Sequence, residues 1–374
     1  MSDYFGKETP KLGFGLMRLP KKGDGTDIEQ VKKMVDLFMA AGFTYFDTAF
    51  VYGTSEQDIK KALVDRYPRD SYTLATKLNA FLMAPNEKAA KEQFTTSLER
   101  TGAGYFDYYL LHAMMENNYT KYDKFHLWDY VAQKKADGLI KHLGFSFHAG
   151  PKLLDKLLTD HPEVDFVQLQ INYADWENPD VTSRANYEMA RSHGKSIVVM
   201  EPVKGGNLAD PPAAVKKLFA DYAPDASSAS WAIRFVANLD GIITVLSGMS
   251  SVSQMEDNLS YMKDFKPLNE DEQGIICEAQ RILGHSAAIP CTACHYCTDG
   301  CPRQIPILDI FAAANKQLGN GQMAQAMERY AAVTSEGHRA SDCIGCKQCE
   351  RACPQHLLIT KYLGQCAEML EKAE

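Results

Sequence analysis

The cysteines constrain the fold of this chain more tightly than any other feature. Eight of the ten fall into two copies of one spacing, C-x2-C-x2-C-x3-C, and proline directly follows each copy. In a reducing compartment, cysteines at this density indicate metal binding rather than disulfide bonds. We therefore expect the tail of the chain to fold around metal. The eight cysteines are Cys291, Cys294, Cys297, Cys301, Cys343, Cys346, Cys349 and Cys353.

The start of the chain and its charge indicate where it works. The amino terminus, MSDYFGKETPK, is polar and lacks the apolar core of a signal peptide, so we expect a cytoplasmic protein. No apolar run approaches the roughly 18 residues of a membrane-spanning helix, so we expect no membrane partner. The net charge of −8 would repel phosphate backbones, so nucleic acid is not an expected partner either.

The cysteine spacing matches the bacterial ferredoxin signature, in which the fourth cysteine of each run ligates the other cluster. A structural zinc site is the alternative, although such sites use two close ligand pairs separated by a longer loop. The segments ILDIFAAANKQ and GQMAQAMERYAAV between the runs have helical spacing, so the module resembles the helical ferredoxins. Cys277 and Cys366 are expected to be buried or incidental. By the resemblance, Cys291, Cys294, Cys297 and Cys353 hold one 4Fe-4S cluster, and Cys343, Cys346, Cys349 and Cys301 hold a second.

The first 270 residues alternate short apolar runs with amphipathic stretches. The runs begin with LGFGLM, FTYFDTA, YTLATK and YFDYYLLH and continue with IKHLGFS, FVQLQIN, SIVVME and GIITVLS. Helical spacing separates them, at residues 27–41, 55–66, 87–101, 123–137, 151–160, 182–193, within 212–238 and at 252–263. Eight such units predict an α/β fold, a closed (β/α)8 TIM barrel, with its chemistry at the carboxyl ends of the strands.

Four polar residues follow or end these predicted strands. Asp47 ends the second strand, Tyr52 lies in the loop after it, Lys77 ends the third and His112 ends the fourth. Each has an ordinary structural explanation when taken singly. Together they suit catalysis, because a lysine beside a tyrosine favours the ionised phenol and a carboxylate fixes that lysine. We expect Tyr52 to give a proton to an oxyanion and His112 to orient a carbonyl group.

The motifs FDTAFVYGTSE, LATK and YYLLH resemble those of the aldo-keto reductases in order and spacing, over residues 1–270. GFGLMRLP, GFSFH and the cysteine-rich tail make the chain similar to the iron-sulphur-containing branch of that family. The resemblance implies an oxidoreductase with Asp47, Tyr52, Lys77 and His112 as its catalytic tetrad. It also implies two domains, an aldo-keto reductase barrel at 1–270 and a helical 4Fe-4S ferredoxin-like domain at 271–374.

The resemblance implies a site for a nicotinamide dinucleotide, and the chain departs from the family pattern there. It keeps Ser146 and Gln168 but has Phe147 for an expected Asn and Met200 for the aromatic residue that stacks on nicotinamide. Lys and Arg for a 2′-phosphate are replaced after the eighth strand. The glycine-rich turns after strands seven and eight can still cradle phosphate. The candidate cofactor residues are Ser146, Gln168, Met200, Lys204, Gly205, Gly206, Gly248, Met249, Ser250, Gln254 and Asn258.

Three functions remain open at this point. The first is reduction, or the reverse oxidation, of a carbonyl compound with NAD(P)H, accompanied by two 4Fe-4S clusters. The second is a reductase that contains FMN and receives single electrons through the clusters from a ferredoxin or flavodoxin-type donor, because nicotinamide moves electrons in pairs. The third is a non-catalytic electron-transfer subunit. Tyr119, Tyr173 and Trp176, in loops after strands four and six, are candidate walls of a substrate pocket.

Overall fold

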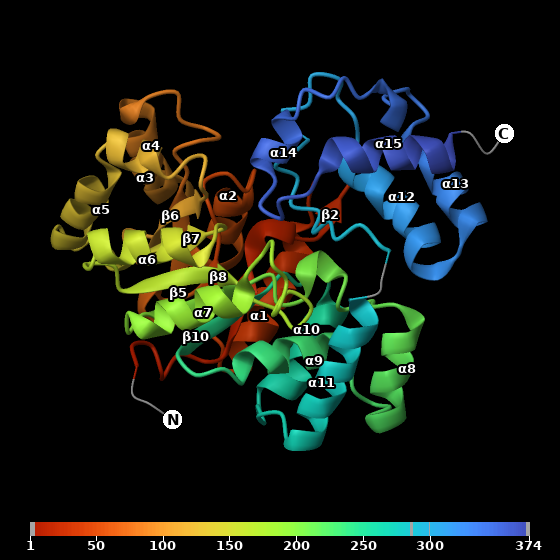
Figure 1. The fold of residues 1–374 in the computed structure, drawn as a ribbon. Helices are drawn as coiled ribbons and strands as arrows, with labels where there is room; N and C mark the ends of the chain where they lie inside the picture. The colour runs from red at the N-terminus through yellow and green to blue at the C-terminus, as the bar shows by residue number, and fades with distance from the viewer. Residues whose placement is uncertain (1–3, 285–286, 299, 372–374) are drawn as a thin grey trace. The chain divides into compact units, whose positions relative to one another are not determined.

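The computed structural model describes residues 4–284, 287–298 and 300–371 (Figure 1). Within these ranges, no helix is both long enough and apolar enough to cross a membrane. The chain forms two compact units.

The two units do not divide the chain at a single point. The first unit contains the chain up to Pro202 together with Ala229–Leu268. The second contains Val203–Ser228 together with the chain from Asn269 onward. The second unit thus includes a segment, Val203–Ser228, that the sequence pattern assigned to the barrel.

The first unit is a closed parallel barrel, as the alternation of strands and helices predicted. Among the described residues, eight strands form the ring in the order β1-β10-β9-β8-β7-β6-β5-β4, and β1 closes it by pairing with both β4 and β10. All eight carboxyl ends lie at one rim because the strands are parallel. The strands are β1 (Leu12–Gly15), β4 (Tyr45–Asp47), β5 (Thr73–Leu78), β6 (Phe106–Met114), β7 (Ile140–Phe147), β8 (Phe166–Gln170), β9 (Ser196–Met200) and β10 (Ile242–Ser247).

The helices of this unit lie outside the strands, as Figure 1 shows for α3, α5, α6 and α7. Their ends follow from capping. The side chains of Asp27, Asn86 and Ser251 accept the first free N–H groups of α1, α3 and α10. The helices are α1 (Ile28–Ala40), α2 (Ser55–Ile59), α3 (Glu87–Thr101), α4 (Thr120–Lys124), α5 (Leu127–Ala136), α6 (Pro151–Asp160), α7 (Ser183–Ser192), α9 (Ser228–Ala237) and α10 (Val252–Met262).

Two of the predicted helices differ from simple α-helices. The stretch predicted at 123–137 is divided into α4 and α5, because His126 takes a left-handed conformation (φ 50°) between them. The stretch predicted at 55–66 continues from α2 into a π-helical turn, Lys60–Val64. A short hairpin, β2 (Lys21–Lys22) with β3 (Gly25–Thr26), was not predicted because it contains no apolar run.

Side chains from six of the eight strands pack together inside the barrel. A Cβ atom at Gly144 on β7 would lie 2.6 Å from the ring of Phe166 on β8, so glycine makes room for that ring. The interior is therefore packed, and chemistry is confined to the rim. The inward cluster consists of Tyr45, Ala75, Tyr108, Leu110, Phe166, Val198, Ile243 and Leu246.

The second unit is mainly helical, which confirms the prediction of a helical tail. Asn269 begins α11 with a capping box, in which Asn269 and Glu272 each accept the other's backbone N–H. Two further 3-10 turns, Lys204–Gly206 and Ala340–Asp342, connect its elements. The helices are α8 (Ala213–Tyr222), α11 (Glu270–Leu283), α12 (Ile307–Asn320), α13 (Met323–Val333), α14 (Gln348–Ala352) and α15 (Ile359–Leu370).

The two cysteine runs have the same backbone conformation. His295 in the first run and Lys347 at the same place in the second are both left-handed, with φ 68° and 59°. Gln304 and His356, three residues after the fourth cysteine of each run, both have φ 53°. The matching sequence spacing therefore produces a structural repeat, with α12 following one run and α15 following the other.

Candidate active site

Asp47 and Lys77 form a buried ion pair at the rim of the barrel. Asp47 is the last residue of β4 and Lys77 the penultimate residue of β5, and the two strands are neighbours. Lys77 Nζ donates to Asp47 Oδ1 at 2.5 Å and to the carbonyl oxygen of Thr48 at 2.7 Å. Burial raises the pKa of Asp47 and lowers the pKa of Lys77, while the attraction between the two groups opposes both shifts. The pair is therefore fixed and shielded from water.

Tyr52 and His112 complete a cluster with this pair. Lys77 Nζ lies 5.2 Å from the centre of the Tyr52 ring, and the Tyr52 and His112 rings meet edge to face with centroids 5.7 Å apart. Tyr52 is partly exposed, whereas His112 is buried. Burial, and then the nearby Lys77 and His148, lower the pKa of His112 well below its ordinary value. The structure thus brings all four predicted tetrad residues together, with a neutral imidazole beside a phenol.

Glu56 is a buried acid that acts on Lys77 through its charge, and it was not predicted from the sequence. Its side chain is almost fully buried and accepts hydrogen bonds from Thr76 Oγ1 at 2.8 Å and Arg100 Nη1 at 3.3 Å. Its charge raises the pKa of Lys77 and so opposes the effect of burial. Glu56 is the final letter of the motif FDTAFVYGTSE, so the sequence contained the signal.

Tyr122 and His148 position the end of β6. Tyr122 Oη donates to the carbonyl oxygen of His112, and the backbone N–H of His148 donates to the carbonyl oxygen of Met114 at 2.9 Å. His148 ends the phrase GFSFH, which served only as a mark of resemblance, and its ring contributes to the lowered pKa of His112. These contacts hold His112 in place at the rim.

The predicted nicotinamide residues occupy the rim on neighbouring strands. Ser146 Oγ on β7 accepts the N–H of Ala113 at 2.7 Å, where β6 bulges and Ala113 is left-handed (φ 58°). Gln168 on β8 is 2% exposed, and within the described ranges its Oε1 atom has no hydrogen-bond partner. Met200 ends β9 and is partly buried. A buried acceptor such as Gln168 Oε1 fits an amide N–H of a bound group.

The predicted phosphate loop before α10 is already hydrogen-bonded by side chains of this chain. The N–H of Ser250 donates to Gln254 Oε1 at 2.7 Å, and the N–H of Val252 donates to Gln30 Oε1 at 3.3 Å. The N–H of Gln254 donates to Ser251 Oγ at 3.2 Å. A phosphate at this helix terminus would therefore have to displace the two glutamine side chains.

Three further residues define the rest of this loop. Asn258 Oδ1 accepts from Ser247 Oγ at 2.7 Å and so secures the end of β10, and Met249 is buried. A Cβ atom at Gly248 would lie 3.9 Å from Arg18 Nη1, and Arg18 Nη2 lies 3.4 Å from Glu201 Oε1. Arg18 thus brings a cation to the loop that the sequence analysis had found to lack one.

Lys204, Gly205 and Gly206 belong to the second unit. Gly205 is left-handed (φ 65°), and a Cβ atom there would lie only 2.3 Å from the carbonyl oxygen of Thr292. Asn207 Nδ2 also donates to the carbonyl oxygen of Cys291 at 3.0 Å. The structure therefore explains Gly205 by close packing against the first cysteine run, and a phosphate-binding role for this turn stays a prediction.

The eight cysteines line two separate cavities in the second unit, in the crossed arrangement that the ferredoxin resemblance implied. The Cys291 sulfur accepts the N–H of Ala293 at 3.5 Å, and such bonds suit a thiolate. Cys366 lies buried in the core of the unit, where burial raises its pKa to about 12, and Cys277 is exposed on α11. One cavity is lined by Cys291, Cys294, Cys297 and Cys353, and the other by Cys301, Cys343, Cys346 and Cys349.

Two of the aromatic residues proposed as pocket walls anchor a loop instead. Tyr173 is fully buried and lies edge-on to Phe235 of α9, with ring centroids 6.3 Å apart. Trp176 packs against Phe235 at 5.6 Å and Tyr187 of α7 at 5.7 Å. Their contacts are therefore with the helices outside the strands. Tyr119 is partly exposed in the loop after β6.

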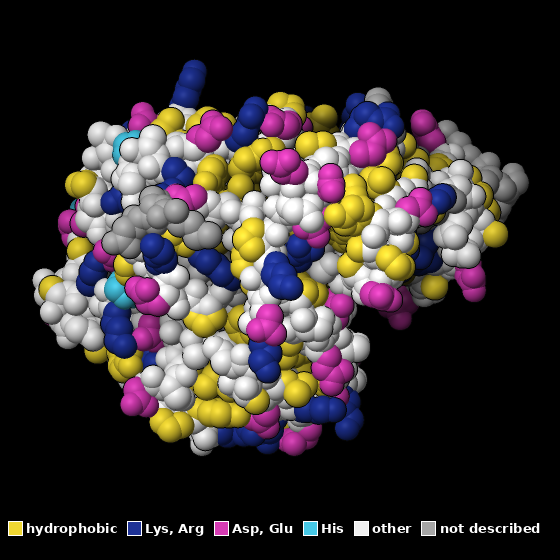
Figure 2. Space-filling model, turned by 90° about the horizontal axis from the view of Figure 1, so that it is seen from below, with side chains coloured by type: hydrophobic (Ala, Val, Ile, Leu, Met, Phe, Trp, Pro, Cys, Tyr) yellow, Lys and Arg dark blue, Asp and Glu magenta, His cyan; other side chains and the backbone are white. Residues whose placement is uncertain are grey.

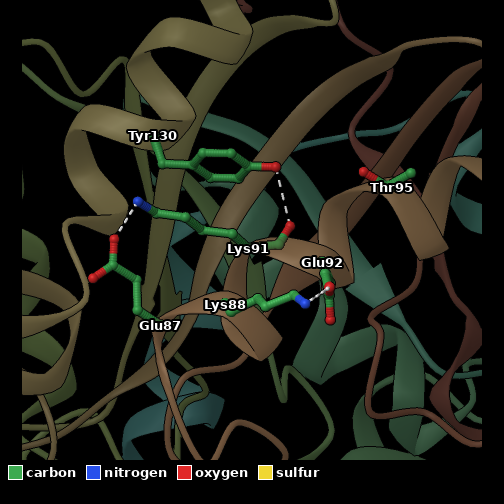
Figure 3. A pocket seen from close by; sticks show the side chains of 6 residues that line it. All are labelled: Glu87, Lys88, Lys91, Glu92, Thr95 and Tyr130. Carbon is green, nitrogen blue, oxygen red and sulfur yellow. Dashed lines mark hydrogen bonds and ion pairs between the residues drawn. The ribbon is translucent and has the colours of Figure 1, made fainter.

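A shallow groove on the outer surface between α3 and α5 carries no catalytic constellation (Figure 3). Its charges satisfy one another: Lys91 Nζ lies 2.5 Å from Glu87 Oε1, and Lys88 Nζ lies 3.7 Å from Glu92 Oε1. Tyr130 Oη donates to the carbonyl oxygen of Lys91 at 3.0 Å. The groove is an ordinary helix surface with ion pairs one turn apart.

Two family models match the barrel and the tail separately. The model of the aldo/keto reductase family matches residues 11–281. The chain belongs to this family. A 4Fe-4S dicluster domain model matches residues 290–358, so this aldo-keto reductase carries an iron-sulphur domain after its barrel.

Individual relatives of this aldo-keto reductase are distant. The aldo-keto reductase str7 of Strobilurus tenacellus is 31% identical over 53% of this chain, which spans 59% of the length of str7. The holo form of aldo-keto reductase AKR11C1 from Bacillus halodurans is 26% identical, with a TM-score of 0.57 over 72% of this chain and 91% of that one. A Klebsiella pneumoniae aldo/keto reductase in complex with NADP and acetate is 18% identical, with a TM-score of 0.60 over 74% and 94% of the two chains, and shares the fold.

Proposed function

We propose that the barrel reduces an aldehyde or ketone with hydride from NAD(P)H and that Tyr52 is the proton donor. The observation that carries this proposal is the buried Lys77–Asp47 pair beside the Tyr52 ring. A buried ion pair is costly to keep unless it serves a purpose, because desolvating two charges offsets much of their attraction. A proton donor becomes an anion when it gives up its proton, and stabilising that anion would be the purpose of this pair.

Residues of this chain supply the proton that carbonyl reduction requires. When bound, NAD(P)H supplies hydride to the carbonyl carbon, and the C=O π electrons move to the oxygen. Tyr52 Oη gives its proton to that oxygen, which leaves an alcohol and a tyrosinate. The ammonium group of Lys77 stabilises this tyrosinate, and Asp47 holds the ammonium in place. Because Tyr52 is partly exposed, solvent can return the proton.

His112 orients the substrate in this proposal. Its lowered pKa keeps the imidazole neutral at physiological pH, so it can donate an N–H hydrogen bond to the carbonyl oxygen. A neutral ring adds no second positive charge next to Lys77. The same N–H then stabilises the negative charge that develops on the oxygen during reduction.

The rim fits a nicotinamide dinucleotide in part. The buried Oε1 atom of Gln168 can accept the carboxamide N–H, and the hydroxyl of Ser146 can donate to the carboxamide oxygen. The glutamine-capped loop before α10 has no Lys or Arg of its own for a 2′-phosphate, and Arg18, the cation that reaches this loop, is paired with Glu201. We therefore propose that NADH serves at least as well as NADPH.

The tail fits iron-sulphur clusters. Four thiolates around each of two cavities form the donor set that iron-sulphur clusters take. We propose that the two sets hold one 4Fe-4S cluster each, and that the clusters supply one-electron transfer. A reducing compartment, the cytoplasm, would keep these eight thiols available for ligation.

A flavin-dependent reductase is the second candidate. Met200 favours it, because this partly buried thioether replaces the aromatic residue that would stack on nicotinamide. A flavin such as FMN accepts electrons singly or in pairs, so it could join one-electron donors to carbonyl reduction. Assaying the cofactor released from anaerobically purified protein separates the two candidates, since only this second candidate predicts flavin.

The Tyr52→Phe substitution tests the proposed chemistry. We expect kcat for carbonyl reduction by NADH or NADPH to fall by about 10²–10⁴-fold, the usual contribution of a general acid, with nicotinamide binding retained. Tyr130→Phe is the matched control, because it removes a phenol from the outer groove between α3 and α5, away from the rim. Unchanged turnover in Tyr52→Phe would sink the catalytic assignment and favour a non-catalytic electron-transfer subunit.

A further inference from the structure

The two cysteine runs repeat one another in backbone conformation but differ in exposure. Residues 344–348, between Cys343 and Cys349, are all exposed, including Cys346. At the matching places of the first run, residues 292–296, only His295 is exposed and Thr292 is buried. The turn at Gly205 packs on the first run, where a Cβ atom would lie 2.3 Å from the carbonyl oxygen of Thr292. The second set thus has an exposed member, Cys346, whereas no cysteine of the first set is exposed.

This exposed turn is apolar at its tip. Ile344 has 63% of its surface exposed, more than any other large apolar side chain in the described ranges. It lines the wall of the second cysteine cavity together with Cys346. An isolated exposed isoleucine needs no explanation, but one that borders a redox-active ligand set gives a partner protein an apolar contact at the shortest path to that set.

Basic side chains border the same cavity. Lys347 is exposed, and Arg303, whose side chain is 52% exposed, lies 3.9 Å from Asp342 Oδ1, at the limit of an ion pair. Glu350, the nearest acid along α14, turns inward and accepts from the N–H and hydroxyl of Thr360 at 2.9 and 2.6 Å. Asp342, whose side chain is 37% exposed, offsets part of the Arg303 charge, so the outward positive charge that lines the second cavity comes from Lys347 and the exposed part of Arg303.

The remainder of the chain has the opposite sign. Residues 1–290 contain 32 basic and 39 acidic side chains, so they carry most of the net charge of −8. On the face drawn in Figure 2, Lys and Arg alternate with Asp and Glu, and neither sign forms a continuous field. An acidic protein would thus be repelled by the chain as a whole and attracted locally by Arg303 and Lys347, which orients it before contact.

We propose that Ile344, Lys347 and Arg303 form the docking surface for a small acidic electron-carrier protein. This proposal rests on the proposed function, since it requires a cluster held by Cys301, Cys343, Cys346 and Cys349. To the proposed function, the docking surface adds the place where a partner makes contact and the charge of that partner. The occupant is a carrier protein rather than a second copy of this chain, because a two-fold contact would set Lys347 and Arg303 against their own copies.

Binding to a defined probe tests the docking surface. Iron-loaded protein is titrated anaerobically, by calorimetry, with a purified acidic ferredoxin of the two-cluster bacterial type in its oxidised form. We expect weak binding that fades between low and moderate salt, as exposed charge pairs are screened over about 10 Å at 0.1 M. In Lys347→Glu and Arg303→Glu together we expect affinity to fall by about tenfold or more, with iron content unchanged.

Matched controls make each outcome decisive. Arg329→Glu on α13, which reverses a charge of the same unit at a residue that lines neither cavity, should leave affinity unchanged. Equal binding of a basic c-type cytochrome, no loss of affinity in the double variant, or self-association abolished by Ile344→Ser would each overturn the proposal. Loss of iron from wild-type protein would instead refute the proposed function, so the two failures are distinguishable.

Discussion

The Asp47–Lys77 pair makes the sharpest prediction about stability, because both charges are buried and 2.5 Å apart. Lys77→Met leaves the Asp47 carboxylate buried without its partner. Asp47→Leu leaves the Lys77 ammonium group buried without its carboxylate. Each single change should lower the free energy of unfolding by about 3–5 kcal/mol. At about 2–4 °C per kcal/mol for a unit of this size, the unfolding midpoint should fall by about 6–20 °C.

The double variant, Asp47→Leu with Lys77→Met, should be far less damaging than the sum of its parts. Removing both charges removes the desolvation penalty together with the attraction, so we expect a loss of no more than about 2 kcal/mol. Catalysis should be lost in both variants that replace Lys77, because Tyr52 then lacks its stabilising cation, and it should be weakened in Asp47→Leu, where the carboxylate that holds the ammonium group is gone. The stability effect and the catalytic effect are thereby separated.

Tryptophan fluorescence is the suitable assay. The three tryptophans of the chain, Trp128, Trp176 and Trp231, all lie in the barrel unit, so their emission follows that unit during heating. Lys88→Met is the control: Lys88 is paired with Glu92 on the exposed face of α3 at 3.7 Å, and it should change stability by less than about 1 kcal/mol. Single variants whose free energy of unfolding falls by less than about 1 kcal/mol would refute the reasoning. So would a double variant whose loss equals the sum of the two single losses.

Two further predictions concern the imidazole and the second unit. Because the pKa of His112 is lower in the folded protein than the ordinary value near 6.5, the unfolded chain takes up a proton first, so stability should fall as pH drops below about 6.5. A ¹⁵N imidazole spectrum at pH 6 should show a neutral ring, and a protonated ring would contradict the assignment. Gly205→Ala should reduce the iron content, because its Cβ would meet Thr292 at 2.3 Å. Gly321→Ala, with a similar φ of 68° and open space, should cost only the left-handed strain of about 1–2 kcal/mol and retain iron.

The barrel was predictable because its signals are local. Eight apolar runs of strand length, each followed by helical spacing, allow few other arrangements, and the motif spacing placed Asp47, Lys77 and His112 at strand ends. The helix break at His126 was not predictable, since left-handed backbone is uncommon at any residue other than glycine, even at histidine, where it is enriched. The assignment of Val203–Ser228 to the second unit depends on tertiary contacts that no local pattern reports.

The supporting residues of the site were harder to find than the tetrad. Glu56 and Arg18 lie inside motifs that were quoted for resemblance, but their partners come from distant parts of the sequence: Thr76 lies on β5, and Glu201 directly follows β9. A side chain that acts through hydrogen bonds to distant strands leaves no periodic trace in the sequence. The glutamine caps before α10 were missed for the same reason, because Gln30 reaches Val252 from α1.

The crossed lining of the two cavities determines when the tail can be completed during synthesis. The second set lacks a member until Cys349 is made, and the first set until Cys353 is made, so neither is whole until the second cysteine run has been synthesised. At about 5–20 residues per second, the early cysteines wait several seconds with exposed thiols. Cluster insertion must therefore follow translation of the second cysteine run, and a chain that stops before residue 349 would leave both sets incomplete.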